Sequence, residues 1–203
     1  MTRNALFAGI LACLALAACS GEPEAFEAAE EAVVDLGPAV GASVPSVSLV
    51  DAAGERRDLA NLTGENGLVL YFNRSLDWCP FCQAQVIEIE AALDAFESRG
   101  YAVAVITYDE VETLAMFADR RDVSLTLLAD PDSVAIDAFG VRDPVYADPE
   151  NYAFGVPYPV TFVIDPEGRV QFKFWHEPGL GQEGGYRIRV SVEDVLDALD
   201  ARR

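Results

Sequence analysis

The sequence holds very few positively charged or metal-binding side chains. It has one histidine, His176, and one lysine, Lys173, and its 14 basic residues face 34 acidic ones, giving a formal net charge of −20. A single histidine makes a multi-histidine metal site or a Ser-His-Asp triad hard to build. Nucleic acids and anionic lipid headgroups are recognised through clustered Lys and Arg. The composition therefore argues against a nucleic-acid partner and a polybasic membrane patch, and the acidity fits a soluble exported protein.

Cysteine is also scarce, and the four present divide by position. Cys13 lies in an apolar leader, Cys19 closes that leader, and Cys79 and Cys82 form a single CxxC pair. A lone CxxC in a domain of this size is typical of a redox-active disulfide. A structural zinc site would need four ligands, and attachment of c-type haem would need a histidine where Gln83 stands. An inert structural disulfide is an alternative, because exported proteins commonly form them.

The first 18 residues have the features of an export signal. Arg3 provides a positive start, and residues 5–18 form an apolar run that is short for a membrane-spanning helix. The motif Leu-Ala-Ala-Cys at residues 16–19 resembles the lipobox of bacterial lipoproteins. This resemblance implies removal of residues 1–18, lipidation of Cys19, and anchoring at the periplasmic face of the inner or outer membrane of the cell envelope. The alternative is an ordinary cleaved signal peptide with a chance cysteine.

The rest of the chain divides into a tether and one domain. Residues 19–42 are rich in Glu and Ala and lack a sustained apolar stripe, so we expect a tether. Residues 43–203 alternate between strand-like and helix-like patterns. We expect strands at 68–72, 101–107, 125–129, 161–164 and 169–175, and helices from 82 to 100, 110 to 121, 133 to 139 and 191 to 201. This order, with an extra N-terminal strand near Val47, predicts an α/β fold with a mixed central sheet and helices on both faces.

The two cysteines of the CxxC pair stand where a strand is expected to pass into a helix. A short polar loop follows the apolar run 68–72, and a helical pattern begins directly after Cys82. Unpaired backbone N–H groups and the macrodipole at a helix N-terminus favour negative charge, so a thiol there ionises more easily. We expect Cys79 to take the exposed N-terminal position as the nucleophile, and Cys82, one turn later, to resolve the intermediate.

Two motifs carry a resemblance to a known family. The segment Trp78-Cys79-Pro80-Phe81-Cys82 resembles the active site of thioredoxin-fold proteins, and Tyr158-Pro159 with the following Val-Thr-Phe-Val-Ile-Asp resembles that family's cis-proline strand. The interval between them is similar to that of membrane-anchored thiol reductases of bacterial envelopes and of AhpC/TSA peroxiredoxins. The resemblance implies a thioredoxin-like fold with an insertion before the cis-proline strand.

The same resemblance implies roles for the residues of the two motifs. Trp78, Pro80 and Phe81 would shape the site around the cysteines. Pro159 would be the cis residue, and it would hold the backbone of Tyr158 for pairing with an incoming polypeptide. No bound cofactor is needed, because the cysteines themselves carry the electrons.

Two chemistries fit this resemblance. In the first, the chain is a thiol–disulfide oxidoreductase of the envelope that acts on protein thiols or disulfides. Cys79 attacks a partner disulfide, Cys82 resolves the mixed disulfide, and the resemblance implies a membrane thiol-transfer partner that resupplies electrons. In the alternative, the chain is a peroxiredoxin-like antioxidant enzyme that reduces hydroperoxides through Cys79.

The residues around Cys79 favour the disulfide chemistry. Peroxiredoxins typically carry Thr or Ser three residues before the cysteine and Pro seven residues before it, and these positions hold Leu76 and Phe72. The arginine that usually steadies the peroxide would lie near Pro159, and Arg74 is a candidate substitute. Without such donors the peroxide oxygens lose groups that stabilise their developing charge. We therefore predict a thiol–disulfide oxidoreductase as the main function.

Other residues are candidates for supporting roles. Asp77 and Glu88 are candidate proton carriers for Cys82, although in so acidic a chain a carboxylate is more often a solvated surface charge. The loop from Arg142 to Tyr158, which is rich in proline and tyrosine, is a candidate for substrate selection. A third hypothesis is a non-catalytic thioredoxin-fold binding module, and the intact Cys-Pro-Phe-Cys argues against it.

Overall fold

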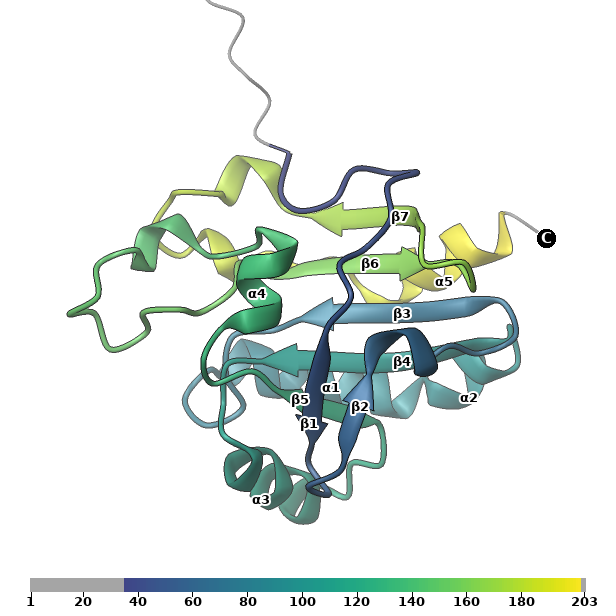
Figure 1. The fold of residues 1–203 in the computed structure, drawn as a ribbon, viewed down its shortest axis with the longest axis horizontal. Coiled ribbons are helices and arrows are strands. Elements are labelled where there is room, and N and C mark those ends of the chain that lie inside the picture. The colour runs from purple at the N-terminus through teal and green to yellow at the C-terminus, as the bar shows by residue number, and fades with distance from the viewer. Residues whose placement is uncertain (1–34, 202–203) are drawn as a thin grey trace, which may run out of the picture. The chain divides into compact units, whose positions relative to one another are not determined.

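A seven-stranded mixed sheet runs through residues 35–201, the part of the chain that the computed structural model describes (Figure 1). The strand order is β2-β1-β5-β4-β3-β6-β7. Strands β3, β4 and β5 are parallel, and every other neighbouring pair is antiparallel. The strands are β1 Ser48–Asp51, β2 Arg56–Asp58, β3 Gly67–Phe72, β4 Tyr101–Thr107, β5 Thr126–Ala129, β6 Val160–Ile164 and β7 Val170–Trp175. The predicted mixed sheet with an extra N-terminal strand is confirmed.

Strand β3 is an inner strand of the sheet. Its six residues are all buried, and it pairs with β4 on one side and with β6 on the other. Its side chains alternate between two hydrophobic clusters: Val69 and Tyr71 face one, and Leu70 and Phe72 face the other. An unbroken apolar run is what a strand covered on both faces requires. The loop that carries the two cysteines therefore begins from a rigid, fully paired strand.

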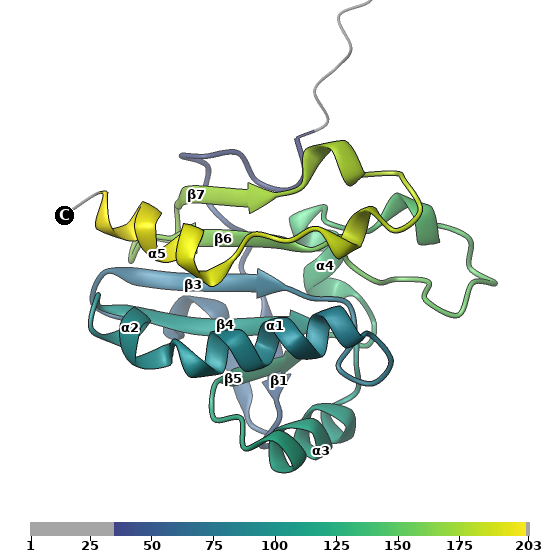
Figure 2. The ribbon, with the colours of Figure 1, turned by 180° about the vertical axis from the view of Figure 1, so that it is seen from behind.

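Helices cover both faces of the sheet, as predicted (Figures 1 and 2). Helices α1, α2 and α5 lie on one face, and α4 lies on the other. The α3 residues Leu114 and Phe117 belong to the same cluster as α1 and α5. The helices are α1 Pro80–Ala91, α2 Leu93–Glu97, α3 Val111–Arg121, α4 Val134–Phe139 and α5 Val192–Asp200. No helix within residues 35–201 has the length and apolar character that crossing a membrane demands.

Helix boundaries follow the predicted signals in most places. Ser191 caps α5 by accepting a hydrogen bond from the N–H of Asp194 at 3.1 Å, as its position predicts. Gly100, with φ of +77°, ends the turn after α2. The single helix expected between Cys82 and Gly100 is interrupted at Ala92, whose backbone leaves the helical region.

Strand β2 is not among the strands predicted from the sequence. It pairs with β1 across a hairpin whose turn is held by Asp51, and the carboxylate of Asp51 accepts hydrogen bonds from the N–H groups of Ala53 and Glu55 at 2.9 Å each. The sequence of β2, Arg-Arg-Asp, has no apolar alternation because this short edge strand lies mostly at the surface.

Residues 35–42 belong to the domain, so the predicted start at residue 43 is wrong. Leu36 is 4% exposed and joins the hydrophobic cluster that α4 covers. The N–H of Gly41 donates to the carbonyl of Val170, and the N–H of Val170 donates to the carbonyl of Ala42. The remainder of the predicted tether, the signal segment and Cys19 lie outside the described residues.

Replacing Leu36 by Ala tests this boundary. We expect Leu36→Ala to lower the free energy of unfolding by about 2–4 kcal/mol, because it removes a buried side chain and leaves a cavity. Val40→Ala, four residues away and 64% exposed, is the matched control and should change stability by less than about 0.5 kcal/mol. Urea denaturation of both variants provides the measurement. Equal free energies of unfolding for the two variants would show that residues 35–42 do not stabilise the domain.

Candidate active site

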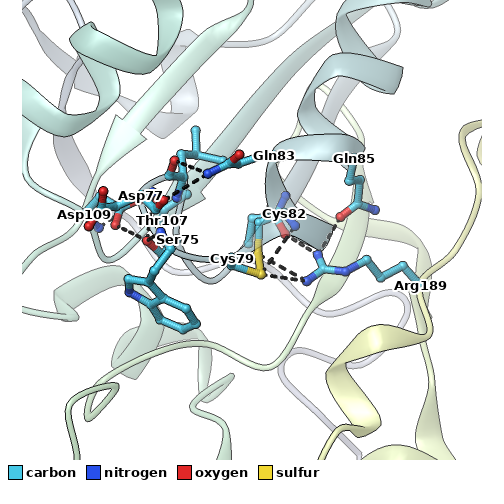
Figure 3. Close-up of a disulfide and its surroundings, with 12 residues drawn as sticks. Ser75, Asp77, Cys79, Cys82, Gln83, Gln85, Thr107, Asp109 and Arg189 are labelled. Atoms are coloured by element: carbon cyan, nitrogen blue, oxygen red, sulfur yellow. Dashed lines mark hydrogen bonds between the residues drawn. A yellow bond between two sulfur atoms is a disulfide. The ribbon is translucent and has the colours of Figure 1, made fainter.

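Cys79 and Cys82 lie at the junction of strand β3 and helix α1, as predicted (Figure 3). Cys79 is the N-cap of α1, with Pro80 at the first helical position. Its Sγ lies 3.4 Å from the backbone N of Cys82, whose N–H also donates to the carbonyl of Cys79 at 3.1 Å. The two cysteines form a disulfide with their Cα atoms 5.3 Å apart. Negative charge on the Cys79 sulfur would therefore be stabilised by the helix terminus.

Both sulfurs are covered, which corrects the prediction that Cys79 is exposed. Cys79 is 1% exposed and Cys82 is fully buried. Within the motif, Pro80 and Phe81 reach the surface, and Phe81 is 41% exposed. The covering group on one side is Arg189, which reaches the disulfide from the segment that precedes α5 (Figure 3). A local sequence pattern cannot reveal this cover, because it comes from the far end of the chain.

Arg189 is the main functional residue that the sequence analysis missed. Its Nη2 lies 3.2 Å from Sγ of Cys82 and 3.9 Å from Sγ of Cys79. Its Nη1 donates to Oε1 of Gln85 at 2.8 Å and to Oδ1 of Asn73. The guanidinium is thus aimed at the sulfurs by one residue from the loop after β3 and one from α1. No motif marks Arg189, and the fold alone brings it to the site.

Burial changes the acidity of Arg189. Burial and, to a smaller extent, the positive charge of Arg74 lower the pKa of the guanidinium to about 10. A pKa of about 10 still leaves the group positively charged at neutral pH. A cation therefore lies beside two sulfurs that are neutral in the disulfide. Reduction converts these sulfurs to thiols, which can ionise to thiolates.

Arg74 lies close by in an aromatic enclosure. Its guanidinium carbon is 3.6 Å from the ring centre of Tyr186, 4.3 Å from that of Tyr146 and 5.2 Å from that of Trp78. The side chain is fully buried, and its three nitrogens have no hydrogen-bond partner among the described residues. Cation–π contacts with desolvated rings are worth about 2 kcal/mol. The structure therefore places the predicted Arg74 at the site, held by aromatic faces.

Asp109 fixes the loop that delivers the cysteines. Its carboxylate accepts hydrogen bonds from the hydroxyl of Ser75 at 2.7 Å, the N–H of Leu76 at 2.6 Å and the hydroxyl of Thr107 at 2.9 Å. The Ser75 hydroxyl in turn accepts from the N–H of Asp77 at 3.0 Å. Burial raises the pKa of Asp109 above its usual range, although these hydrogen bonds oppose the shift. Sequence analysis missed Asp109, which follows the neighbouring parallel strand β4.

Trp78 connects the cysteine motif to the long loop. Its indole N–H donates to the hydroxyl of Tyr108 at 2.9 Å, and its ring meets that of Tyr152 edge to face at 5.4 Å. Tyr152 and Tyr146 both belong to the loop from Arg142 to Tyr158 that was expected to select substrates. The structure brings this loop to the site, with Tyr152 74% exposed at its rim.

The prediction of a cis-proline at residue 159 is wrong. All peptide bonds within residues 35–201 are trans, the isomer of lower free energy for an X–Pro bond. The N–H of Tyr158 donates to the carbonyl of Val141 at 2.8 Å, so it is not presented to an incoming polypeptide. Pro159 nevertheless lines a small cavity together with Gln85 and Arg189. Pro159 therefore lies beside the site, as predicted, but the peptide bond that precedes it is trans and not cis.

Tyr158 has a different role from the predicted one. Its side chain is 1% exposed, and its hydroxyl donates toward the carbonyls of His176 at 2.8 Å and Gly185 at 3.3 Å. Burial raises the pKa of this phenol to about 12. Both carbonyls belong to the segment 176–190, which we call the strap. Tyr158 therefore anchors the strap that carries Arg189.

The two predicted proton carriers lie at the surface. Asp77 is exposed, and its carbonyl accepts from the side chain of Gln83 at 3.0 Å. Glu88 is exposed and accepts from the N–H of Val192 at 3.3 Å. Neither carboxylate hydrogen-bonds to a cysteine sulfur within the described residues. No group of three His, Cys, Asp or Glu side chains between residues 35 and 201 is arranged to hold a metal ion.

Together, the sheet, the strand-to-helix junction and the paired cysteines define a thioredoxin-fold protein with a dithiol–disulfide centre. A comparison with known families matches residues 40–173 to the AhpC/TSA family. The chain belongs to this family. Membership confirms that the protein is an oxidoreductase, and it supports the predicted thioredoxin-like, peroxiredoxin-like class.

Individual relatives agree with this assignment. Peroxiredoxin Bcp of Escherichia coli (strain K12) is 28% identical over 134 residues, which are 64% of this chain and 81% of that protein. The crystal structure of peroxidoxin BcpB from Mycobacterium tuberculosis superposes with a TM-score of 0.64 at 23% identity, covering 81% of this chain and 97% of the other. A structure of Xanthomonas campestris peroxiredoxin Q gives a TM-score of 0.59 at 24% identity, covering 76% and 90%. These similarities favour the alternative prediction, the peroxiredoxin, over the general thiol–disulfide oxidoreductase.

Replacing Arg189 by Met tests its electrostatic influence on the thiols. We expect Arg189→Met to raise the pKa of the more reactive thiol of the reduced protein by about 1 unit, because a nearby cation favours the thiolate. The pH dependence of alkylation by iodoacetamide, followed by mass spectrometry, measures this pKa. Arg120→Met, at an exposed position of α3, is the control and should leave the pKa unchanged. An unshifted profile in Arg189→Met would exclude an electrostatic role for this residue.

Proposed function

We propose that the protein is a thiol peroxidase that reduces hydroperoxides through Cys79. The observation that carries this proposal is the position of Arg189, with Nη2 3.2 Å and 3.9 Å from the two sulfurs. The absence of a suitable arginine near Pro159 in the sequence argued against peroxide chemistry. Arg189 extends from the strap and lines the same cavity as Pro159, so it supplies a cation at this place. Its position supports peroxide chemistry.

Cys79 is the proposed nucleophile because of its position on helix α1. It is the N-cap, and its sulfur accepts from the N–H of Cys82 in the first turn of the helix. The Cys79 thiolate attacks the terminal oxygen of the hydroperoxide, and the O–O bond breaks. The sulfur becomes a sulfenic acid, and the departing alkoxide takes up a proton and leaves as an alcohol. Arg189 is placed to stabilise the negative charge that develops on the oxygens.

Cys82 completes the proposed cycle. Its thiolate attacks the sulfenic sulfur of Cys79, the S–O bond breaks, and hydroxide leaves as water after protonation. The product is the Cys79–Cys82 disulfide, the state that the structure contains. The two electrons that reduce the hydroperoxide thus come from the two thiols. An external thiol must then reduce the disulfide before another turnover.

A thiol–disulfide oxidoreductase is the second candidate, favoured by the CxxC spacing of the disulfide. Two features weigh against it: the N–H of Tyr158 is engaged by Val141, and the bond before Pro159 is trans. A non-catalytic binding module does not explain why a cation contacts the cysteine sulfurs. The peroxidase accounts for more of the geometry.

The proposal includes a place in the cell envelope. Its support is the apolar leader and the lipobox-like motif that ends at Cys19, both of which lie outside the described residues. Lipidation of Cys19 would tether the folded domain to the inner or outer membrane through residues 20–34. The peroxidase would then act on hydroperoxides at the periplasmic face.

Stopped-flow tryptophan fluorescence tests the peroxidase activity. Trp78 precedes the nucleophile, so oxidation of Cys79 should change its emission. We expect hydrogen peroxide or an organic hydroperoxide to oxidise the reduced protein orders of magnitude faster than a free thiolate. Cys79→Ser should show no fast phase, whereas Cys82→Ser should react once and retain a sulfenic acid. A wild-type rate no better than that of a free thiolate would reject the peroxidase in favour of disulfide exchange.

Replacing Cys19 by Ser tests the proposed anchor. The wild-type chain, expressed with its leader in a bacterial host that processes lipoproteins, should partition into the detergent phase of a Triton X-114 extract. Cys19→Ser should move to the aqueous or unprocessed fraction, because acyl chains can no longer be attached. Cys13→Ser, within the leader, is the matched control. Identical partitioning of all three proteins would rule out lipidation at Cys19.

A further inference from the structure

The disulfide is poorly accessible to another folded protein. Cys79 is 1% exposed and Cys82 is buried, with Arg189 and the strap over them. Reduction requires a thiolate to approach one sulfur in line with the S–S bond. A protein dithiol can do so only where that sulfur reaches the surface. A small thiol needs a much smaller opening, such as a local displacement of the strap, which carries glycines at residues 179, 181, 184 and 185.

The backbone near the site is also unsuited to pairing with a polypeptide. Strand β6, which begins at Val160, is paired with β3 on one side and with β7 on the other. The N–H of Tyr158, just before this strand, donates to the carbonyl of Val141. An extended segment of a partner protein would find this hydrogen-bond donor already occupied. Strand β6 therefore has no open edge for β-augmentation.

Three arginines lie near the cysteines, although the chain as a whole is strongly acidic. The full sequence carries −20, yet Arg189 touches the sulfurs and Arg74 lies close enough to lower its pKa. Arg187 is exposed, and its guanidinium carbon lies 5.9 Å from the ring centre of Phe81 within the CxxC motif. A small anionic thiolate would be attracted to this cluster of cations. A protein partner with an acidic surface would also meet the repulsion of the rest of the chain.

Arg189 is positioned to assist the first step of reduction. A thiolate that attacks Sγ of Cys79 forms a mixed disulfide and expels Cys82 as a thiolate. Nη2 of Arg189, at 3.2 Å, lies against that departing sulfur. A leaving thiol of lower pKa departs faster, and the neighbouring cation lowers this pKa. A second thiolate then attacks the sulfur contributed by the first, which releases the Cys79 thiolate and a small-molecule disulfide.

From these features we infer that the electron donor of this protein is a small anionic monothiol, not a protein dithiol. Two monothiols are oxidised to one disulfide, and the Cys79–Cys82 disulfide takes up their two electrons. The inference rests on the proposed function, because hydroperoxide reduction is what produces the disulfide. It also replaces the membrane thiol-transfer partner suggested by the sequence resemblance with a diffusible donor.

Stopped-flow reduction of the purified full chain in its disulfide form tests the inference. The probes are reduced glutathione, neutral 2-mercaptoethanol, cationic cysteamine and a reduced thioredoxin, with rate constants expressed per thiolate. We expect glutathione to be at least as fast as thioredoxin and about tenfold faster than cysteamine at low ionic strength. Faster reduction by thioredoxin than by glutathione would overturn the inference. Because no hydroperoxide is present, this result is independent of whether the peroxidase proposal holds.

Variants of the strap separate its electrostatic role from a structural one. Arg189→Met should slow reduction by glutathione about tenfold, since the expelled Cys82 thiolate loses its partner. Arg187→Glu, at an exposed position, should reverse the order so that cysteamine becomes faster than glutathione. Arg120→Met is the matched control and should behave as the wild type. If glutathione still reduces Arg187→Glu faster than cysteamine does, electrostatic selection of the thiol is overturned. This test remains valid if Arg189→Met fails to fold.

Discussion

A partly buried guanidinium held against two sulfurs is the interaction on which the site depends. Removing a cation from water is costly unless hydrogen bonds or an opposite charge compensate it. Among residues 35–201, the hydrogen-bond partners of Arg189 in the disulfide state are Asn73, Gln85 and the two neutral sulfurs. Reduction to a thiolate supplies the missing negative charge. The environment therefore favours the charged, reduced form of the cysteines relative to the disulfide, and this links the burial of Arg189 to the redox chemistry.

The rest of the site holds this geometry in place. The paired strands β3 and β4 end side by side, so that Asp109 after β4 can accept hydrogen bonds from the loop after β3. This loop sets the start of α1 and hence the N-cap position of Cys79. On the opposite side, the hydroxyl of Tyr158 holds the strap from which Arg189 extends. Two independent anchors therefore fix the cysteine and the arginine relative to one another, as preorganised electrostatic catalysis requires.

Arg74 shows how the same site tolerates a second buried cation. Its three aromatic neighbours come from distant segments: Trp78 from the cysteine motif, Tyr146 from the long loop and Tyr186 from the strap. The negative faces of these rings replace water around the guanidinium. The enclosure also joins the long loop to the strap, so the two segments that border the disulfide meet at one residue. Aromatic rings surround this guanidinium, and no carboxylate within residues 35–201 accepts a hydrogen bond from it.

The local sequence alone determined the elements whose signals lie within a few residues of one another. The apolar run of β3, the CxxC pair at a helix start and the Ser191 cap of α5 could all be predicted, because burial, helix geometry and capping are short-range constraints. Only the tertiary structure decided the identity of the cation at the sulfurs, since Arg189 lies 110 residues from Cys79 and no periodicity links them. The packing of Leu36 was likewise decided by contacts between distant segments, in which the free energy depends on neighbours that a local pattern does not contain.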